Sequence, residues 1–303
     1  MCGVFGFIKK NLNSSQFQIA NELRLMRQMM IVGSLRGIDG TGMAVIDKNF
    51  SPCTLKIGDN PYSLIHDEAF GSAIAKPFED DGRAFFGHNR YATKGEVSTE
   101  NAHPFMIDHI TLVHNGTINF GLDVPKGKVD SMALTQRLAT DGIKVFSEID
   151  GAWTCVWYDS IEKSINFLCN GERPLHIVEN FNGIYWASEE KMLVWTLSSL
   201  NFNFMANVKI PLDTVISYKL DQQLSRTETK VPTRSKYNYQ PHYYIGNDDK
   251  ITKDGYKNKS PKTESKSYIP KKQQSEVIVK FFRKLYNSSK SKNLDSVLGD
   301  LFL

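Results

Sequence analysis

The second residue of the chain, Cys2, combines a thiol with a position at the chain start. An initiator methionine that precedes a small side chain is normally removed, so we expect the mature chain to begin at Cys2. The cysteine would then carry a free α-amine with a pKa of roughly 7.7–8.0, which suits a general base at neutral pH. Because the thiolate is the nucleophilic form of cysteine, one residue would supply both nucleophile and base. A packing role for this cysteine is the alternative.

Four polar segments accompany this cysteine further along the chain. They read RGIDGTG at 36–42, GHNRYATKGEVSTENAHP at 87–104, HNG at 114–116 and VDSM at 129–132. Taken singly, their residues have structural explanations. Arg90 could form a surface ion pair, Asp130 could cap a following helix, and Asn115–Gly116 is a favoured pair for a type I′ hairpin turn. The joint occurrence of the segments with Cys2 argues against a purely structural explanation of them all.

Together with CGVFG at 2–6, these segments resemble the class II glutamine amidotransferase domain of the N-terminal-nucleophile hydrolases, in both order and spacing. The resemblance covers roughly residues 2–220 and includes GERPL at 171–175 and ASE at 187–189. Several motifs in the right order are far more specific than any one of them. The resemblance implies an α+β fold, a four-layer αββα sandwich of two mainly antiparallel sheets.

The resemblance also implies a role for each residue of the reaction centre. Cys2 would attack the side-chain amide carbon of L-glutamine and form a γ-glutamyl thioester while ammonia leaves. The side-chain amide of Asn115 and the backbone N–H of Gly116 would form the oxyanion hole, with glycine allowing close approach. Hydrolysis of the thioester would release glutamate.

A second set of residues would hold the amino-acid end of the substrate. By the same resemblance, Arg90 would bind the α-carboxylate through its two-pronged guanidinium, assisted by Thr93. Asp130 would accept hydrogen bonds from the α-ammonium. The sequence therefore predicts a site for a free amino acid.

The histidines and the other cysteines point to no metal or cofactor. The spacing of His88, His103 and His114 follows no ligand pattern, and we interpret them as supporting residues. The remaining cysteines form no C-x-x-C pair, and we expect them to be buried small hydrophobic residues: Cys53, Cys155 and Cys169. We expect neither a metal nor a cofactor.

The hydrophobic pattern predicts the elements that must position these residues. β-branched and aromatic runs predict strands at 3–8, 42–47, 83–91, 110–114, 152–158, 164–169, 183–187, 204–210 and 214–220. Helical periodicity predicts helices at 16–31, 130–140 and 188–198, the second opened by Asp130 and the third by Ser188. Helices and strands that alternate in blocks are typical of a layered α+β domain.

Composition divides the chain into a body and a basic tail. The 303 residues are 41% hydrophobic and 23% charged, with a net charge of +4, which excludes a wholly disordered or fibrous protein. We expect an amidotransferase domain at 2–225, a flexible basic linker at 226–275, and an amphipathic helix with a tail at 276–303. Without an apolar run that could span a bilayer or form a signal peptide, the sequence predicts a cytoplasmic protein.

Three functions remain open at this point. We expect a stand-alone glutaminase whose ammonia goes to an acceptor enzyme on a separate chain, because the tail contains no phosphate-binding loop of a second catalytic domain. The first alternative is a hydrolase of another γ-glutamyl compound. The second is a non-catalytic binding module whose basic, tyrosine-containing arm docks on a partner or nucleic acid. The complete set of catalytic positions argues against this module, and we do not expect nucleic-acid binding.

Overall fold

A computed structural model describes residues 2–12, 14–93, 95–202, 206–208 and 210–233 of the chain. Seven of its strands form one sheet: β1 (Gly3–Lys9), β2 (Thr41–Ile46), β3 (Pro52–Ile57), β4 (Ala84–Asn89), β9 (His176–Glu179), β10 (Gly183–Ala187) and β11 (Ala206–Val208). Their order across the sheet is β11-β9-β10-β1-β4-β2-β3. The strand that follows Cys2 is therefore central.

A second sheet contains six strands: β5 (Phe105–Ile107), β6 (Ile110–Phe120), β7 (Asp150–Asp159), β8 (Ser164–Cys169), β12 (Thr214–Lys219) and β13 (Arg226–Lys230). Their order is β13-β12-β8-β7-β6-β5. The pairings found among the described strands of both sheets are antiparallel. The strand that contains Asn115 and Gly116, β6, lies beside the edge strand β5.

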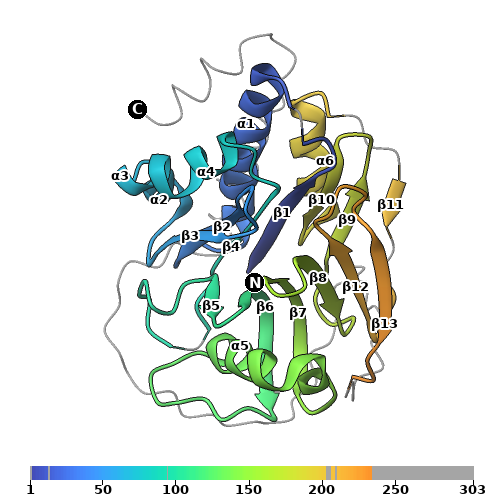
Figure 1. Cartoon of the computed structure of the whole chain (residues 1–303). Helices are drawn as coiled ribbons and strands as arrows, with labels where there is room; N and C mark the ends of the chain where they lie inside the picture. The colour runs from blue at the N-terminus through green and yellow to red at the C-terminus, as the bar shows by residue number, and fades with distance from the viewer. Residues whose placement is uncertain (1, 13, 94, 203–205, 209, 234–303) are drawn as a thin grey trace, which may run out of the picture. The chain divides into compact units, whose positions relative to one another are not determined.

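Helices cover the outer faces of the two sheets (Figure 1). The seven-stranded sheet packs against α1 (Gln16–Gly33), α6 (Glu190–Ser199) and a group of short helices, which comprises α2 (Pro61–Ile65), α3 (Glu68–Phe70), the π-helical turn η2 (Gly71–Ala75) and α4 (Lys76–Glu79). The six-stranded sheet packs against α5 (Asp130–Asp141) and the 3₁₀ helix η3 (Gly142–Ser147), and another 3₁₀ turn, η1 (Ser34–Arg36), follows α1. The layers are helix, sheet, sheet and helix, which confirms the predicted αββα sandwich.

Strand β1 illustrates how the sequence fills these layers. Phe5 and Phe7 belong to the apolar cluster beneath the helices, whereas Val4 and Ile8 belong to the cluster between the two sheets. This alternation follows from the two-residue period of a strand, which sends successive side chains to opposite faces. Because β1 pairs with β10 on one side and with β4 on the other, Cys2 is attached directly to the core.

The predicted elements agree with the structure, with shifts at their ends, and several short elements escaped prediction. The strands β3, β5 and β9 and the helices between 61 and 79 were not expected, because each is too short or too irregular to show a clear period. Strand β11 covers only part of the predicted strand at 204–210. The third helix begins at Glu190 rather than at Ser188, whose side chain bonds to β1 instead.

Strand β13 lies in the segment that the sequence assigns to the basic linker. All of its residues are exposed, and it pairs only with β12, so no alternation of apolar residues marks it. After it, Val231 is buried among the apolar residues beneath α5. The folded body therefore extends past residue 225. The rest of the predicted linker and the predicted helix at 276–286 lie outside the described residues.

Among the described elements, no helix combines the length and the apolar character that crossing a bilayer requires.

Candidate active site

Cys2 lies immediately before β1, with its side chain directed toward the turn after β4. Its Sγ accepts a hydrogen bond of 3.3 Å from the backbone N–H of Tyr91. Burial raises the pKa of the thiol, and the hydrogen bond from Tyr91 opposes that shift. The positive charges of Arg36 and Arg90 also lower the pKa of the thiol. The thiol is thus held in a partly buried, electropositive position. The thiolate is more favoured there than it would be in an equally buried position without positive charges nearby.

Arg90 follows the last residue of β4 and is only 4% exposed. Its Nη1 donates a hydrogen bond of 2.7 Å to the carbonyl of Glu96, so the guanidinium also fixes the loop that follows it. Burial lowers the pKa of Arg90, while the nearby charges of Cys2, Asp39 and Asp130 oppose this effect. The surface ion-pair explanation of Arg90 is therefore wrong, because the side chain lies inside the site.

Asp130 is the first residue of α5, but it does not cap the helix. The N-cap residue is Val129, which makes no side-chain capping bond. The Asp130 carboxylate instead accepts hydrogen bonds from the N–H of Ile118 in β6, at 2.8 Å, and from the N–H of Ser131, at 2.9 Å. The capping prediction is thus wrong, since the carboxylate turns toward β6.

Asn115 and Gly116 lie inside β6, opposite Thr154 and Trp153 of β7. The hairpin-turn explanation of this pair is therefore wrong. Gly116 has φ +147°, and a Cβ on it would lie 2.0 Å from the Ala152 carbonyl oxygen. The glycine is thus required by the close approach of β7. The Nδ2 of Asn115 is buried and has no hydrogen-bond partner among the described residues, so it is available to donate to a ligand.

The structure brings most of the predicted site residues together. The start of β1 lies close to β6, and the two strands contact each other across the sandwich (Figure 1). The charges of Cys2 and Asp130 both act on Arg90, which places the three side chains in one electrostatic neighbourhood. Thr93 is exposed on the loop after Arg90, and it makes none of the hydrogen bonds found among the described residues.

Known proteins resemble this chain in both sequence and fold, although no protein-family model matches the sequence. A glutamine–fructose-6-phosphate aminotransferase [isomerizing] from Pectobacterium atrosepticum is 33% identical over 118 residues, which are 39% of this chain and 17% of the relative. The enzyme of that name from Streptococcus mutans is 26% identical over 202 residues, covering 58% of this chain and 30% of the relative. The matches thus span less than a third of these relatives' own length.

The fold has counterparts among solved structures. The allosteric regulatory enzyme of purine biosynthesis aligns with a TM-score of 0.56 at 18% identity, covering 76% of this chain and 49% of that one. Glutamine phosphoribosylpyrophosphate amidotransferase from B. subtilis aligns with a TM-score of 0.51 at the same 18% identity and the same coverage. These structural neighbours thus share the fold of this chain. The sequence relatives support the resemblance of this chain to a class II glutamine amidotransferase domain.

In the folded chain, the RGIDGTG segment supports the turn that carries Arg90. The carboxylate of Asp39 accepts a 2.8 Å hydrogen bond from the N–H of Ala92, and the N–H of Asp39 donates one of 2.9 Å to the Arg90 carbonyl. A Cβ on Gly37 would lie 2.4 Å from the Arg90 backbone. The role of this motif could not be predicted from the sequence, because contacts between residues about 50 positions apart form only on folding.

Arg36 and Glu189 are two further residues of the domain that sequence reasoning missed. The Nε of Arg36 donates a hydrogen bond of 2.6 Å to the carbonyl oxygen of Cys2. The same guanidinium forms an ion pair with Glu189, the N-cap residue of α6. Both residues belong to motifs that the sequence singles out, so the motifs located them but did not reveal their partners.

The three histidines of the domain form a buried row behind the site. The rings of His88 and His103 lie 3.9 Å apart, centroid to centroid, and those of His103 and His114 lie 6.5 Å apart. Burial lowers the pKa of all three, that of His88 to about 3. In the described part of the chain, no three His, Cys, Asp or Glu side chains could together hold a metal ion.

The other cysteines of the domain have different surroundings. Cys155 and Cys169 are buried, as predicted, whereas Cys53 is only half-buried, on the edge strand β3. The prediction of burial is therefore wrong for Cys53. An edge strand has a neighbour on one side only, so its side chains remain open to solvent.

Proposed function

We propose that this chain hydrolyses the side-chain amide of L-glutamine, with Cys2 as nucleophile. The observation that carries the proposal is that Arg90 lies close enough to Cys2 and Asp130 for the negative charges of a Cys2 thiolate and of the Asp130 carboxylate to act on its guanidinium. A cation for the α-carboxylate and an anion for the α-ammonium would thus lie beside a nucleophile. This combination suits a free amino acid that has a reactive side chain.

The reaction needs a base, a nucleophile and an oxyanion stabiliser. The α-amine of Cys2 takes the thiol proton as the sulfur attacks the amide carbon, and it returns this proton to the leaving ammonia. The developing oxyanion accepts hydrogen bonds from the Asn115 side-chain amide and the Gly116 N–H. A water molecule then cleaves the thioester, which releases glutamate and restores the thiol. The buried, unpartnered Nδ2 of Asn115 supports this assignment.

The substrate clamp is the second part of the proposal. Arg90 binds the α-carboxylate with assistance from Thr93, and Asp130 binds the α-ammonium. The two hydrogen bonds from Ile118 and Ser131 hold the Asp130 carboxylate in place but leave further lone pairs for a ligand. Thr93 is exposed on the loop after Arg90, so its hydroxyl is accessible to a ligand.

The ammonia acceptor is the third part. Ammonia that escapes into water at neutral pH becomes ammonium, which is not nucleophilic, so a glutaminase needs a protected route to its acceptor. We therefore propose that a separate enzyme binds this chain and consumes the ammonia.

Ammonia release from L-glutamine by the purified chain tests the glutaminase assignment. Cys2→Ala should abolish release, and a panel of other γ-glutamyl compounds should react more slowly than glutamine. Fast turnover of another γ-glutamyl compound with none of glutamine would favour the hydrolase alternative. Absence of turnover on all of them would favour the binding module.

A pull-down from the native host tests whether a separate acceptor enzyme binds this chain. The glutaminase rate should be measured with and without each recovered protein, and a true acceptor should raise the rate and form an aminated product. If no protein is retained and the isolated chain is fully active, the proposal of a partner enzyme is contradicted.

A further inference from the structure

A buried hydrogen bond joins the strand of the oxyanion residues to the helix of the substrate carboxylate. The Nδ1 of His114, in β6, lies 2.8 Å from the hydroxyl oxygen of Ser131, in α5. The two residues are only 2% and 3% exposed. Each is the direct neighbour of a residue in the proposed site, since His114 precedes Asn115 and Ser131 follows Asp130.

A second contact joins the same two elements on the other side of the oxyanion pair. The N–H of Ile118 donates its 2.8 Å bond to the carboxylate of Asp130. His114 and Ile118 thus attach the start of α5 to β6 at points that flank Asn115 and Gly116. Two attachments prevent rotation of the helix start about either one alone.

The charge state of His114 suits this role. Burial lowers its pKa, with the charge of Asp130 acting in the opposite direction, so the imidazole is neutral at physiological pH. A neutral imidazole has one donor nitrogen and one acceptor nitrogen, and a serine hydroxyl can complement either. The bond to Ser131 therefore persists without burying a charge.

We propose that His114 and Ser131 are positioning residues for the α-ammonium site. Their hydrogen bond sets where the Asp130 carboxylate lies relative to Asn115 and Gly116, and so it determines how strongly the enzyme prefers a substrate with an α-amino group. This inference rests on the proposed glutaminase function. Neither residue touches the substrate.

The test compares two substrates that differ only in the group that Asp130 would recognise. These are L-glutamine and glutaramate, which lacks the α-amino group. Ser131→Ala and His114→Phe should each reduce kcat/KM for L-glutamine by about three- to tenfold, mainly through KM, as expected for the loss of one hydrogen bond. The value for glutaramate should change less than about twofold. The double variant should be no worse than the more damaging single variant.

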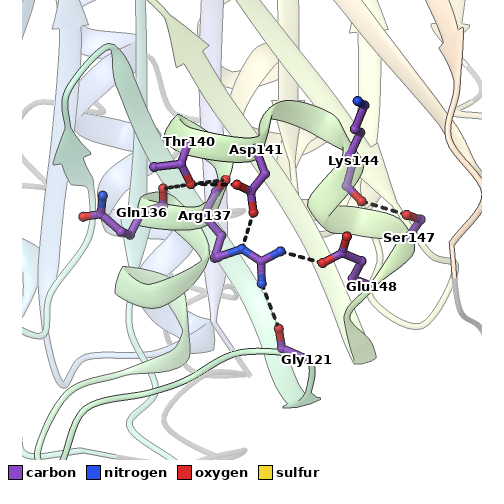
Figure 2. Close-up of polar contacts among 8 residues, drawn as sticks. All are labelled: Gly121, Gln136, Arg137, Thr140, Asp141, Lys144, Ser147 and Glu148. Carbon is purple, nitrogen blue, oxygen red and sulfur yellow. Dashed lines mark hydrogen bonds and ion pairs between the residues drawn. The ribbon is translucent and has the colours of Figure 1, made fainter.

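Two matched variants separate positioning from stability. His114→Asn can still bond to Ser131 and should recover most of the preference for L-glutamine. Arg137→Gln loosens the other end of α5, where Arg137 bonds to Asp141, Glu148 and the Gly121 carbonyl (Figure 2). It should lower the melting temperature without changing the ratio of the two kcat/KM values. If His114→Phe does not fold, Ser131→Ala decides the test, because it removes a single oxygen atom.

The possible outcomes distinguish the inference from the function on which it rests. An inactive wild-type chain would overturn the glutaminase assignment, and the positioning role with it. An active wild-type chain whose Ser131→Ala variant keeps the full substrate preference, or loses both activities equally, would overturn the positioning role alone.

Discussion

The Nε of Arg36 donates a hydrogen bond of 2.6 Å to the carbonyl oxygen of Cys2, and the Arg36 side chain is almost fully buried. This bond fixes the backbone of the residue that we propose as nucleophile. The ion pair with Glu189 holds the other side of the guanidinium. The position of the thiol therefore depends on contacts with two segments far away in the sequence.

Replacement of Arg36 should therefore impair turnover. Arg36→Gln removes the positive charge near the thiol and weakens the bond to the Cys2 carbonyl, so kcat should fall by at least about tenfold. Glu189→Gln keeps the bond to Cys2 and should lose less activity. Steady-state glutaminase assays compare the two, and an equal loss in both variants would mean that the ion pair, not the bond to Cys2, is what matters.

Labelling should identify the nucleophile. The glutamine analogue 6-diazo-5-oxonorleucine should modify Cys2 and leave Cys53, Cys155 and Cys169 unmodified, because the analogue needs the substrate clamp. Intact-mass and peptide mass spectrometry measure both the label and the loss of Met1. An active protein that retains Met1 would contradict the role of the α-amine as base. Label on any other cysteine would contradict the assignment of Cys2 as the nucleophile.

The substrate clamp should be sensitive to conservative changes. Arg90→Lys keeps the charge but loses the two-pronged geometry, and Asp130→Asn loses the ion pair with the ammonium, so each should lower kcat/KM by at least about a hundredfold. Thr93→Val should cause a smaller loss. Circular dichroism checks that the fold is intact. A wild-type kcat/KM in either clamp variant would remove that residue from the clamp.

The oxyanion residues should respond in two different ways. Asn115→Ala removes only a donor, so kcat should fall by about a hundredfold to a thousandfold, with the fold intact. Gly116→Ala places a Cβ 2.0 Å from the Ala152 carbonyl oxygen and should also destabilise the protein by more than about 1 kcal/mol in urea unfolding. Gly127→Ala is the control, because its φ is also positive but no atom lies within 4 Å of the added carbon. Equal destabilisation by the two alanines would mean that backbone conformation, not contact with β7, requires Gly116.

The buried histidines should make the fold sensitive to acid. The pKa of His88 is lowered from 6.5 to about 3 in the folded chain, so the unfolded chain binds more protons between these values. Neutral His88 therefore contributes to the stability of the fold above about pH 6.5. This contribution is lost as the pH falls toward 3, by up to about 1.4 kcal/mol per pH unit. Urea unfolding at pH 7, 6 and 5 measures the slope. His88→Phe should reduce this slope.

The sequence by itself selected the candidate site residues. Cys2, Arg90 and Asp130 stand in motifs whose order is specific, and β1 and β4 show in the sequence as apolar runs because both faces of each strand are buried. Local signals of this kind can be recognised without knowledge of the fold, because they depend only on side-chain type and spacing. The layered architecture followed from the same motifs and from the alternation of helices and strands.

Only the tertiary structure decided what several of these residues do. Asn115–Gly116 has a local preference for a turn, but pairing with β7 holds it in an extended strand. Asp130 could have capped α5, yet the N–H of Ile118 draws its carboxylate to β6. Strand β13 has no apolar residue to mark it and exists because β12 offers it a partner. In each case a contact with a distant segment outweighs the local preference, and such contacts form only when the two sheets and their helices pack together.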